Sequence, residues 1–461
     1  MTTHESDTRT LLEVPRVRRG DGVGGMLAFR RDQLSFLRRG IDRYGDVFRF
    51  RLVGMEMVLV NQPDLIRQVL VERTDRYNKG AALFEIVRPV LGDGLIVSDG
   101  ELWHRQRRMM APTFTMRTVP RFVRTMTTET QRMVDGWRDR TDADGPVDVS
   151  TEIGRVALRI VTQSLFSADV AATIPAFERA FATANTVMGA FFRFPFPPLK
   201  VPTPGHRRLL RATTAMDEFV SGFIEARLAK DAGAEEDADL LTLLMHAVDE
   251  EDGTKMDLKQ LHDEVLNLCI AAFETTTNTL AWAFYLLARH PEVERTLHAE
   301  VDEVLAGRVP AFDDIPRLTY TRMVIDEVLR IYSPAYQTMR HASVDDELGG
   351  YRIPAGTNVL INSYFLHRHQ DFWPEPEEFR PERFGPDQAG DRPRHAYLPF
   401  GSGPRICIGK HFALVELVLV LATVARTHRL VAPEGAAEVR PDPLITLHPH
   451  GGVHLYPVAR R

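Results

Sequence analysis

The hydrophobic and polar positions along the chain follow mainly the period of about 3.6 residues that amphipathic helices show. Helices are expected over residues 32–44 and 63–72, with two paired strands between them over 47–52 and 57–60, where apolar residues alternate or run together. Further helical patterns, separated by Gly, Pro and charged stretches, cover residues 101–110, 119–137, 150–166, 171–190, 207–230 and 239–248. The pattern predicts a mainly α-helical protein with small β-sheets, an α+β fold.

The longest helical pattern begins after Asp257, a possible N-cap, and continues as far as Pro291. At ~1.5 Å per residue this helix would be roughly 50 Å long. It is apolar nearly all round, which predicts that it is buried. Its polar interruption, Glu274–Thr277, lies near mid-length, where helix propensity alone favours Ala or Leu. Either these threonines bond carbonyls of their own helix, or the polar group serves chemistry.

The C-terminal third mixes short elements with irregular chain. A helix over 313–332 is followed by short strands with turns at Gly349–Gly350 and Pro354–Gly356. Residues 372–399 are proline-rich and irregular, and a last helix is expected over 409–428. No repeat and no low-complexity linker divides the chain.

Composition narrows the class of protein. The chain has 461 residues, of which 44% are hydrophobic and 26% charged, so disordered, collagen-like and disulfide-built proteins are excluded. Its net charge of −6 gives no reason to expect nucleic acid or a membrane surface as a partner. Residues 1–22 show no signal-peptide pattern, and the most apolar stretch, Phe412–Ala425, is too short to span a bilayer. We expect a cytoplasmic protein without a membrane anchor.

The chain has 2 cysteines, Cys269 and Cys407, which cannot form a disulfide framework. Cys407 lies in the glycine-rich run Phe400–Gly409, just before the last expected helix. The free N–H groups and the positive dipole end of a helix start favour a thiolate there. The alternative is a buried structural cysteine in a turn. The spacing F-x-x-G-x-R-x-C-x-G would arise by chance in roughly one such chain in ten thousand, which favours a functional thiolate.

This segment resembles that of the cytochrome P-450 family of haem-thiolate monooxygenases, of the soluble bacterial type. The resemblance covers residue 25 to the C-terminus and implies one large haem-binding domain over 25–461, after a polar tail over 1–24. In the family the matching cysteine is the proximal metal ligand, which implies that Cys407 binds the iron of haem b (iron protoporphyrin IX). The resemblance also implies that Phe400 packs beside the thiolate and that Arg405 pairs with a haem propionate.

Glu327 and Arg330 match the family's E-x-x-R motif. Residues three apart share a helix face, so the alternative is an exposed ion pair of little energetic value. The family places this pair in the interior, bonded to an arginine of a P-E-R-F segment, here Arg383. The resemblance implies that Glu327, Arg330 and Arg383 have a structural role and hold the cysteine loop in place.

The segment Ala271–Thr276 resembles the family's A-G-x-D/E-T-T motif. The reaction requires protons to be delivered inside an apolar pocket that excludes bulk water. The resemblance implies catalytic roles for Thr275, which would face the dioxygen, and for Glu274, which would connect it to solvent. Ala272 departs from the motif, because it stands where many members have Gly and adds a methyl group.

Further segments match the family's propionate-binding positions. Trp103 and Arg107 fit W-x-x-x-R, whose members reach one haem propionate together; a plain amphipathic helix is the alternative. Arg340 would bind the other propionate, and His341 is a weaker candidate. His367 and His369 lack third and fourth ligands, so no metal is assigned to them.

An arginine run without an intervening acid lies between Glu101 and Glu129: Arg105, Arg107, Arg108, Arg117, Arg121 and Arg124. Such a run is usually a solvated face. In the family, however, this region borders the cysteine side of the haem, so steering of an acidic electron donor is the second interpretation.

By analogy with the family, the substrate pocket lies among the central helix, a loop over 81–97 and residues 335–339. These residues are mostly apolar, which favours a hydrophobic terpenoid, fatty acid, steroid or polyketide. The aromatic and proline-rich run over 191–198 would line an entrance or pack in the core. The chain ends shortly after the family's core, so we expect electrons from NAD(P)H through a separate ferredoxin and ferredoxin reductase, or a flavoprotein reductase. A monomer is expected.

The predicted reaction inserts one oxygen atom of dioxygen into a C–H bond. The alternatives are a haem-thiolate peroxygenase or isomerase, and a non-enzymatic haem sensor of gas or redox state. Glu274 and Thr275 argue against the first, because proton delivery from solvent is needed chiefly when dioxygen is the oxidant.

Overall fold

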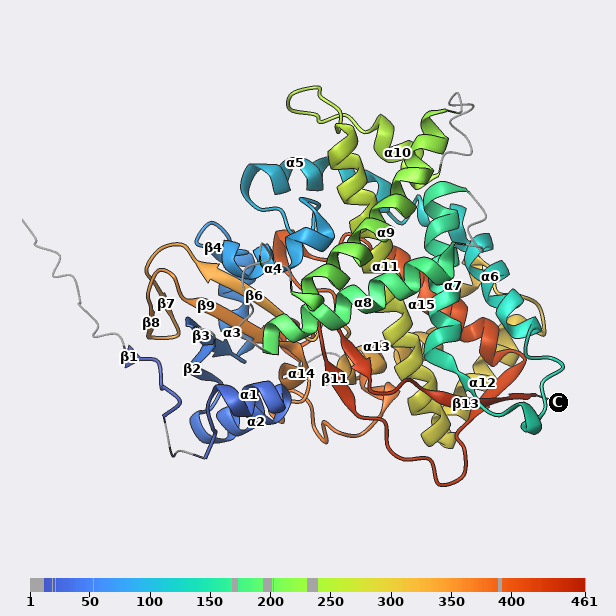
Figure 1. Cartoon of the computed structure of the whole chain (residues 1–461). Coiled ribbons are helices and arrows are strands. Elements are labelled where there is room, and N and C mark those ends of the chain that lie inside the picture. Colours follow the sequence, from blue (N-terminus) through green and yellow to red (C-terminus); the bar gives the residue numbers. More distant parts are fainter. Residues whose placement is uncertain are drawn as a thin grey trace, which may run out of the picture.

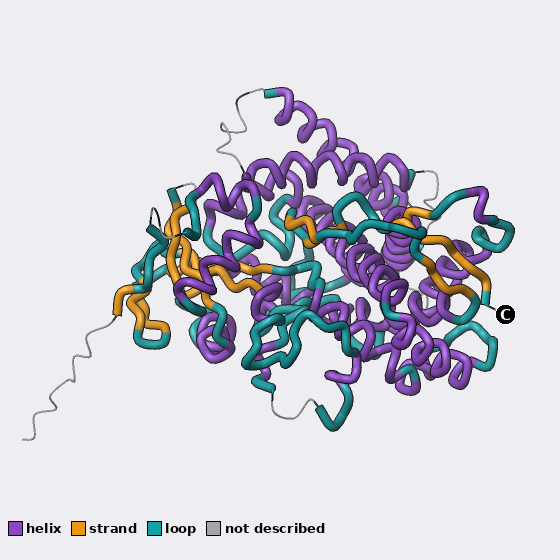
Figure 2. The backbone as a smooth tube through the Cα atoms, turned by 90° about the horizontal axis from the view of Figure 1, so that it is seen from below, coloured by secondary structure: helices purple, strands orange, loops and turns teal. Residues whose placement is uncertain are grey.

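The computed structural model describes residues 12–18, 20, 22–52, 54–167, 173–193, 201, 203–229, 239–388 and 392–460. Helices make up most of the body, while strands gather at one end of the molecule and near the C-terminus (Figures 1 and 2). The α-helices are α1 Met26–Arg31, α2 Gln33–Tyr44, α3 Pro63–Arg67, α4 Ala81–Leu91, α5 Gly100–Met110, α6 Val123–Asp135, α7 Val149–Phe166, α8 Ile174–Arg193, α9 Pro204–Leu228, α10 Leu240–His246, α11 Leu258–Arg289, α12 Pro291–Leu305, α13 Thr319–Ile331, α14 Ser363–Leu366 and α15 Lys410–Ala425.

The strands form small sheets. The largest has the order β2-β3-β9-β6-β4, a second has the order β1-β8-β7, a third β10-β13-β5, and β11 pairs with β12. Their bounds are β1 Leu12–Glu13, β2 Val47–Leu52, β3 Met55–Val60, β4 Tyr77–Asn78, β5 Val147–Asp148, β6 Gln337–Ala342, β7 Asp346–Leu348, β8 Tyr351–Ile353, β9 Asn358–Asn362, β10 His428–Val431, β11 Pro441–Pro443, β12 Leu447–Pro449 and β13 His454–Ala459. The predicted fold class, mainly α with small β-sheets, is confirmed.

Helix α11 crosses the middle of the molecule, with α7 packed along it (Figure 1). It spans 32 residues, and the Asp257 carboxylate caps its start by accepting a hydrogen bond from the Gln260 amide at 2.7 Å. Most of its side chains are buried, as the all-round apolar pattern predicts. A polar group on this helix therefore lies deep in the protein.

Some predicted elements are wrong in detail. Pro291 does end α11, but it also begins α12, because proline is well suited to the first helical position. The helix expected over 313–332 begins only at Thr319; residues Phe312–Arg317, which include Pro316, form a 3₁₀ turn. The expected loop over 81–97 contains α4, whose apolar pattern is interrupted by Pro89.

Two predictions concern other parts of the chain. Most of the aromatic and proline-rich run over 191–198 lies outside the described residues. The division into a tail over 1–24 and a single domain over 25–461 stays a prediction. Within the part of the chain that the structure describes, no helix is both long and apolar enough to cross a bilayer.

Candidate active site

The loop that carries Cys407 is held by its own backbone. The Cys407 amide donates to the Phe400 carbonyl at 2.9 Å, and the Ile406 amide donates to the Gly403 carbonyl at 3.1 Å. Gly403 has a φ of +73°, and a Cβ there would lie 1.9 Å from the Leu70 carbonyl oxygen. Only glycine allows this approach, which fixes the loop against residues 68–72 and delivers Cys407 just before α15.

The Cys407 side chain is exposed to a cavity of about 270 Å³ that Phe400, Arg405 and Thr275 also line. Burial of the surrounding loop raises the pKa of the Cys407 thiol, whereas the Gly409 amide and the charges of Arg107 and Lys410 lower it. By contrast, Cys269 is fully buried within α11, and burial raises its pKa to about 12. The two cysteines therefore differ in accessibility, and only Cys407 faces open space.

Glu327, Arg330 and Arg383 meet in the interior, as predicted from the motif. Arg330 donates two hydrogen bonds to the Glu327 carboxylate, at 2.7 and 2.8 Å, and neither side chain is exposed. The Arg383 Nε lies 3.4 Å from the same carboxylate. Arg330 also donates to three backbone carbonyls, those of His367, Pro376 and Glu378. The cluster thus fastens the irregular chain over 367–383 to α13.

His367 extends this cluster to the cysteine loop, a role that its sequence context does not reveal. Its Nδ1 donates to the Arg330 carbonyl at 3.1 Å, and its Nε2 accepts from the Leu398 amide at 2.8 Å. Burial and the neighbouring Arg330 charge lower its pKa to about 3. A neutral imidazole therefore connects α13 to the residues just before Phe400. His369 contacts Asp46 at 3.2 Å instead.

Cationic side chains converge at one edge of the cavity. Arg405 pairs with Asp99, which precedes α5, and its guanidinium lies 4.2 Å from the centroid of the buried Trp103 ring. Arg107, four residues further along α5, lies close enough to interact electrostatically with Cys407. Arg340, on β6, is buried, and among the described residues it donates to Thr338 and to the Met339 carbonyl. Of the predicted cofactor-binding residues, Phe400, Arg405 and Cys407 line the cavity. The other three lie close to these residues: Trp103 and Arg340 near Arg405, and Arg107 near Cys407.

Lys79 joins the same group, although a single lysine after a short strand gives no signal in the sequence. Its ammonium donates to the carbonyls of Leu95 and Ile96, both at 2.8 Å. Burial, Arg405 and Arg340 lower its pKa to about 6. Arg405 and Arg340 keep their charges, and Asp99 is the carboxylate that pairs with Arg405, so positive charge exceeds negative charge among the described residues at this edge.

These residues fit a haem. A thiolate-bound haem would take a cysteine sulfur as its iron ligand and cationic side chains as partners for its two propionates. The Cys407 side chain borders the cavity, Arg340 has no carboxylate partner among the described residues, and the Arg405 Nη1 is buried without an acceptor there. A buried cation without an anion is costly, so an anionic cofactor resolves an imbalance that the protein alone leaves.

Glu274 and Thr275, in the polar turn of α11, point in different directions. The Thr275 hydroxyl lines the cavity and donates to the Ala271 carbonyl at 2.7 Å, so its bond back to the helix is present. Glu274 is buried and turns toward β12, where its Oε1 accepts from Thr446 at 2.7 Å and lies 2.5 Å from the His448 Nε2. Thr446 and His448 are therefore polar neighbours of Glu274 that the sequence motifs do not indicate.

The arginine run is partly engaged inside the protein. Arg108 donates to both oxygens of Asp249, at 2.7 and 2.9 Å, and Arg105 bonds Gln260 and Thr254. Arg117, Arg121 and Arg124 are exposed. Only these last three remain available for steering a partner.

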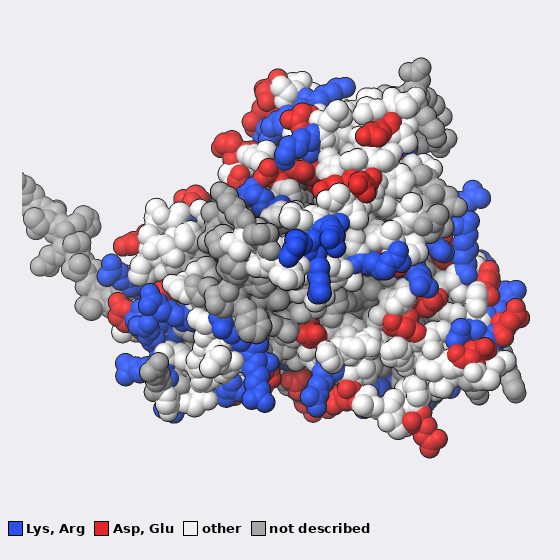
Figure 3. Space-filling model, viewed as in Figure 1, with Lys and Arg blue, Asp and Glu red and all other residues white. Residues whose placement is uncertain are grey.

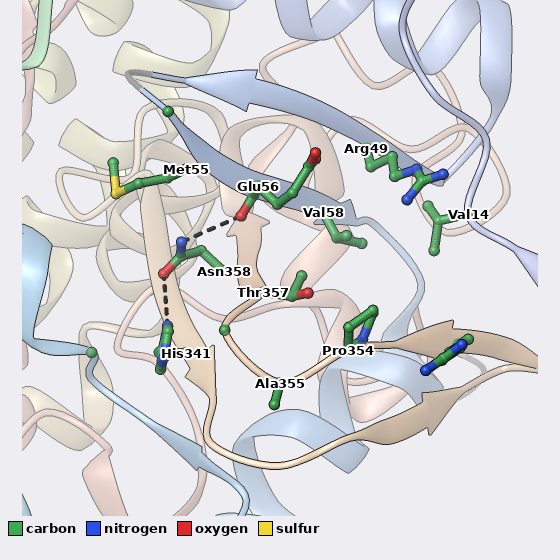
Figure 4. Close-up of a pocket in the computed structure, with 14 residues that line it drawn as sticks. Val14, Arg49, Met55, Glu56, Val58, His341, Pro354, Ala355, Thr357 and Asn358 are labelled. Atoms are coloured by element: carbon green, nitrogen blue, oxygen red, sulfur yellow. Dashed lines mark hydrogen bonds between the residues drawn. The ribbon is translucent and has the colours of Figure 1, made fainter.

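A larger cavity of about 520 Å³ lies elsewhere, against the sheet that contains β3 and β9 (Figure 4). Asn358 lies between the His341 ring and the Glu56 carbonyl, which it bonds at 3.2 and 3.3 Å. Arg49, Val58 and Pro354 also line it, but none of the residues that line it is a cysteine. The smaller cavity at Cys407 is the better candidate active site, because the reactive side chains converge there.

Known proteins are similar to this chain along most of its length. A family model described as "Cytochrome P450" matches residues 22–456. Cyclooctatin synthase from Streptomyces melanosporofaciens is 36% identical, over 92% of this chain and 91% of that protein. Cyclooctat-9-en-7-ol 5-monooxygenase from the same organism is 37% identical, over 88% of this chain and 87% of that protein. Pentalenene oxygenase from Streptomyces avermitilis is 34% identical, over 92% of this chain and 93% of that protein.

A solved structure shares the fold. The crystal structure of the cytochrome P450DA heme domain has a TM-score of 0.88 and 27% sequence identity, and the match covers 98% of this chain and 99% of that one. The cysteine loop and the long central helix therefore lie within a chain that is similar to these proteins along almost its whole length.

Proposed function

The chain belongs to the cytochrome P450 family and is a haem-dependent monooxygenase, and on this premise we propose that it hydroxylates a terpenoid with dioxygen and electrons from a ferredoxin. The overall reaction converts R–H, dioxygen, two electrons and two protons into R–OH and water. The observation that carries the proposal is that Cys407, Thr275 and Arg405 line one cavity. When bound, the haem supplies the binding and activation of dioxygen.

Each residue of the chain then has a defined task. Cys407 is the iron ligand, and Phe400 packs beside its sulfur. Arg340, Arg405, Arg107 and Trp103 bind the propionates and fix the plane of the haem. Glu327, Arg330 and Arg383 hold the loop that presents the sulfur.

Two residues of α11 handle protons. Thr275 places a hydroxyl in the cavity, and the Glu274 carboxylate lies behind it, away from that cavity and within hydrogen-bonding distance of other polar side chains. Proton delivery along such a route favours dioxygen as the oxidant over hydrogen peroxide. The surrounding apolar helices exclude bulk water, which limits loss of the oxidant in side reactions.

The substrate class follows from the relatives. The name pentalenene denotes an unsaturated hydrocarbon and cyclooctat-9-en-7-ol an unsaturated alcohol, so both relatives are named for largely apolar substrates. Among the four classes that the apolar pocket allows, these names favour a terpenoid. The cavity side chains include Leu70, Leu329 and Leu417, which suit a hydrocarbon skeleton without a charged group.

The electron donor is proposed to be a ferredoxin, reduced from NAD(P)H by its own reductase. Phe122, at the start of α6, packs 5.7 Å from the Phe412 ring of α15, which places the exposed Arg121 and Arg124 close to the helix that follows Cys407. An acidic ferredoxin would be attracted to this region. The acids and bases on the face that Figure 3 shows are interspersed, so the steering is local.

The test is turnover of a terpenoid panel by the holoenzyme with a surrogate ferredoxin and reductase. Compounds are first selected by their shift of the haem spin state, and products are then identified by mass spectrometry. We expect a monohydroxylated terpenoid, and loss of coupled turnover in Thr275→Val with binding unchanged. Binding without product across the panel, or equal product from hydrogen peroxide in Thr275→Val and the wild type, would contradict the proposal.

A further inference from the structure

The buried carboxylate of Glu274 belongs to a polar cluster built from three separate parts of the chain. Its Oε1 lies 2.5 Å from the His448 Nε2, accepts from Thr446 at 2.7 Å and contacts the Asn185 Nδ2 at 3.4 Å. The Asn278 amide in turn donates to the Thr446 hydroxyl at 3.0 Å. Helices α8 and α11 and strand β12 therefore meet at this one carboxylate.

Strand β12 is fixed firmly enough to place His448 on Glu274. The Trp282 Nε1 donates to the Leu447 carbonyl at 3.3 Å, and the Leu447 amide donates to the Pro334 carbonyl at 3.0 Å. Both bonds clamp the residue next to His448 against the core. The position of the imidazole is thus set by the fold, which is the condition for a positioning residue.

The cluster joins the interior to solvent. The Glu274 side chain is 8% exposed, whereas the His448 side chain is 23% exposed. Among the described residues, Glu274 is the one charged group within contact of the His448 ring; Asp442 and His450, on the same hairpin, contact each other at 3.4 Å. The imidazole is therefore the polar group that bridges the surface and the buried acid.

The His448 Nε2 lies among several polar groups. It is 2.5 Å from the Glu274 Oε1, 3.0 Å from the Thr446 hydroxyl and 3.2 Å from the Asn185 amide. If Nε2 carries a proton, it donates to the carboxylate; if it does not, it accepts from Asn185 and from a protonated Glu274. The Asn185 Oδ1 is buried and without a partner among the described residues, so it can accept from a water in this cluster.

We propose that His448 is the residue through which protons pass from solvent to Glu274. A proton binds at Nδ1 from water, and the Nε2 proton passes to the Glu274 carboxylate. Loss of the Nδ1 proton to water and protonation of Nε2 by water then restore the starting tautomer. The net result is that one proton enters and one leaves, and no electron moves. The inference rests on the proposed function, because that function makes Glu274 the acid that supplies protons to Thr275.

The test compares His448→Gln with His450→Gln in the holoenzyme. Glutamine keeps a hydrogen-bond donor for Glu274 but cannot carry a proton between two atoms. His450, two residues away and largely exposed at 72%, is the matched control. Substrate-induced spin shifts should be the same in all three proteins, which shows that the fold and haem site are intact.

Two readouts follow. In His448→Gln the share of electrons that reaches product should fall by roughly an order of magnitude, which is less than the ~10²–10⁴-fold contribution of a whole acid–base group. His450→Gln should keep the wild-type share. In infrared difference spectra, the carboxyl band that Glu274→Gln removes should also be absent in His448→Gln and present in His450→Gln.

The outcomes separate the two proposals. If His448→Gln keeps the wild-type share of electrons that reaches product and the wild-type carboxyl band, the relay is wrong while the proposed function stands. If the wild type oxidises no substrate, the proposed function fails, and the infrared comparison still decides whether His448 and Glu274 share a proton.

Discussion

Replacement of Arg330 by methionine tests the buried cluster behind the cysteine loop. Methionine keeps an unbranched apolar side chain but has no donors, so among the described residues Glu327 keeps Arg383 at 3.4 Å and the Arg380 amide at 2.9 Å. The carbonyls of His367, Pro376 and Glu378 also lose the bonds that Arg330 donates. Breaking a buried ion pair costs about 3–5 kcal/mol, and the stranded carbonyls bring the expected loss to the upper end of that range.

This free energy converts into a measurable shift of the melting temperature. With an unfolding entropy of ~2.1 cal/mol/K per residue, a chain of 461 residues loses about 1 °C for each kcal/mol, so Arg330→Met should melt about 5 °C lower. The assay is thermal unfolding of the holoenzyme by circular dichroism at one fixed scan rate. Haem loss should accompany it, because the cluster leads through His367 to the cysteine loop.

Arg322→Met is the matched control. Arg322 lies on the same helix and pairs with Asp326 at 2.7 Å, but its side chain is 43% exposed. An exposed pair contributes under ~1 kcal/mol, so this variant should melt within about 1 °C of the wild type. Equal melting temperatures for the two variants would refute the argument that burial makes Glu327 and Arg330 indispensable.

Three further predictions concern the haem edge, pH and the electron donor. Lys79→Met should weaken haem retention at least tenfold, since a propionate would favour the charged form of Lys79 and a charge-assisted bond contributes ~1.5–3 kcal/mol; transfer of haem to apomyoglobin at the wild-type rate would contradict this. Because burial lowers the pKa of His367 to about 3, its neutral form stabilises the fold above pH ~6.5, and this contribution is lost as the pH falls toward 3, by up to ~1.4 kcal/mol per pH unit. His367→Gln should therefore show a shallower acid dependence in urea unfolding, and parallel curves would refute it. The double variant Arg121→Glu/Arg124→Glu should raise the KM for ferredoxin roughly tenfold at low salt and less at high salt, while Arg138→Glu, an exposed arginine, should not; a KM independent of salt in all proteins would count against steering.

The sequence predicts the parts of the site that are encoded locally. The spacing of Phe400, Arg405 and Cys407 is carried by one short loop, and Glu327 and Arg330 share one helix face. The capped start of α11 at Asp257 is likewise visible in the sequence, because a cap and an apolar pattern are short-range signals.

The remaining parts depend on contacts between distant segments. Lys79 reaches the Arg405 edge because β4 pairs with β6, and His448 reaches Glu274 because Trp282 clamps β12. Neither residue lies in a motif. Arg108 illustrates the same limit, since the acid that engages it, Asp249, lies in a turn far along the chain. Helices α4 and α12 are missed for a local reason, because proline lies inside one and at the first position of the other.

The central claim is that Cys407, and no other residue, binds the haem iron as a thiolate. The most direct measurement is the carbon monoxide difference spectrum of the reduced protein, recorded for the wild type, Cys407→Ser and Cys269→Ala. The account predicts the thiolate-type band in the wild type and in Cys269→Ala, and its loss in Cys407→Ser. A thiolate-type band that persists in Cys407→Ser would contradict the account.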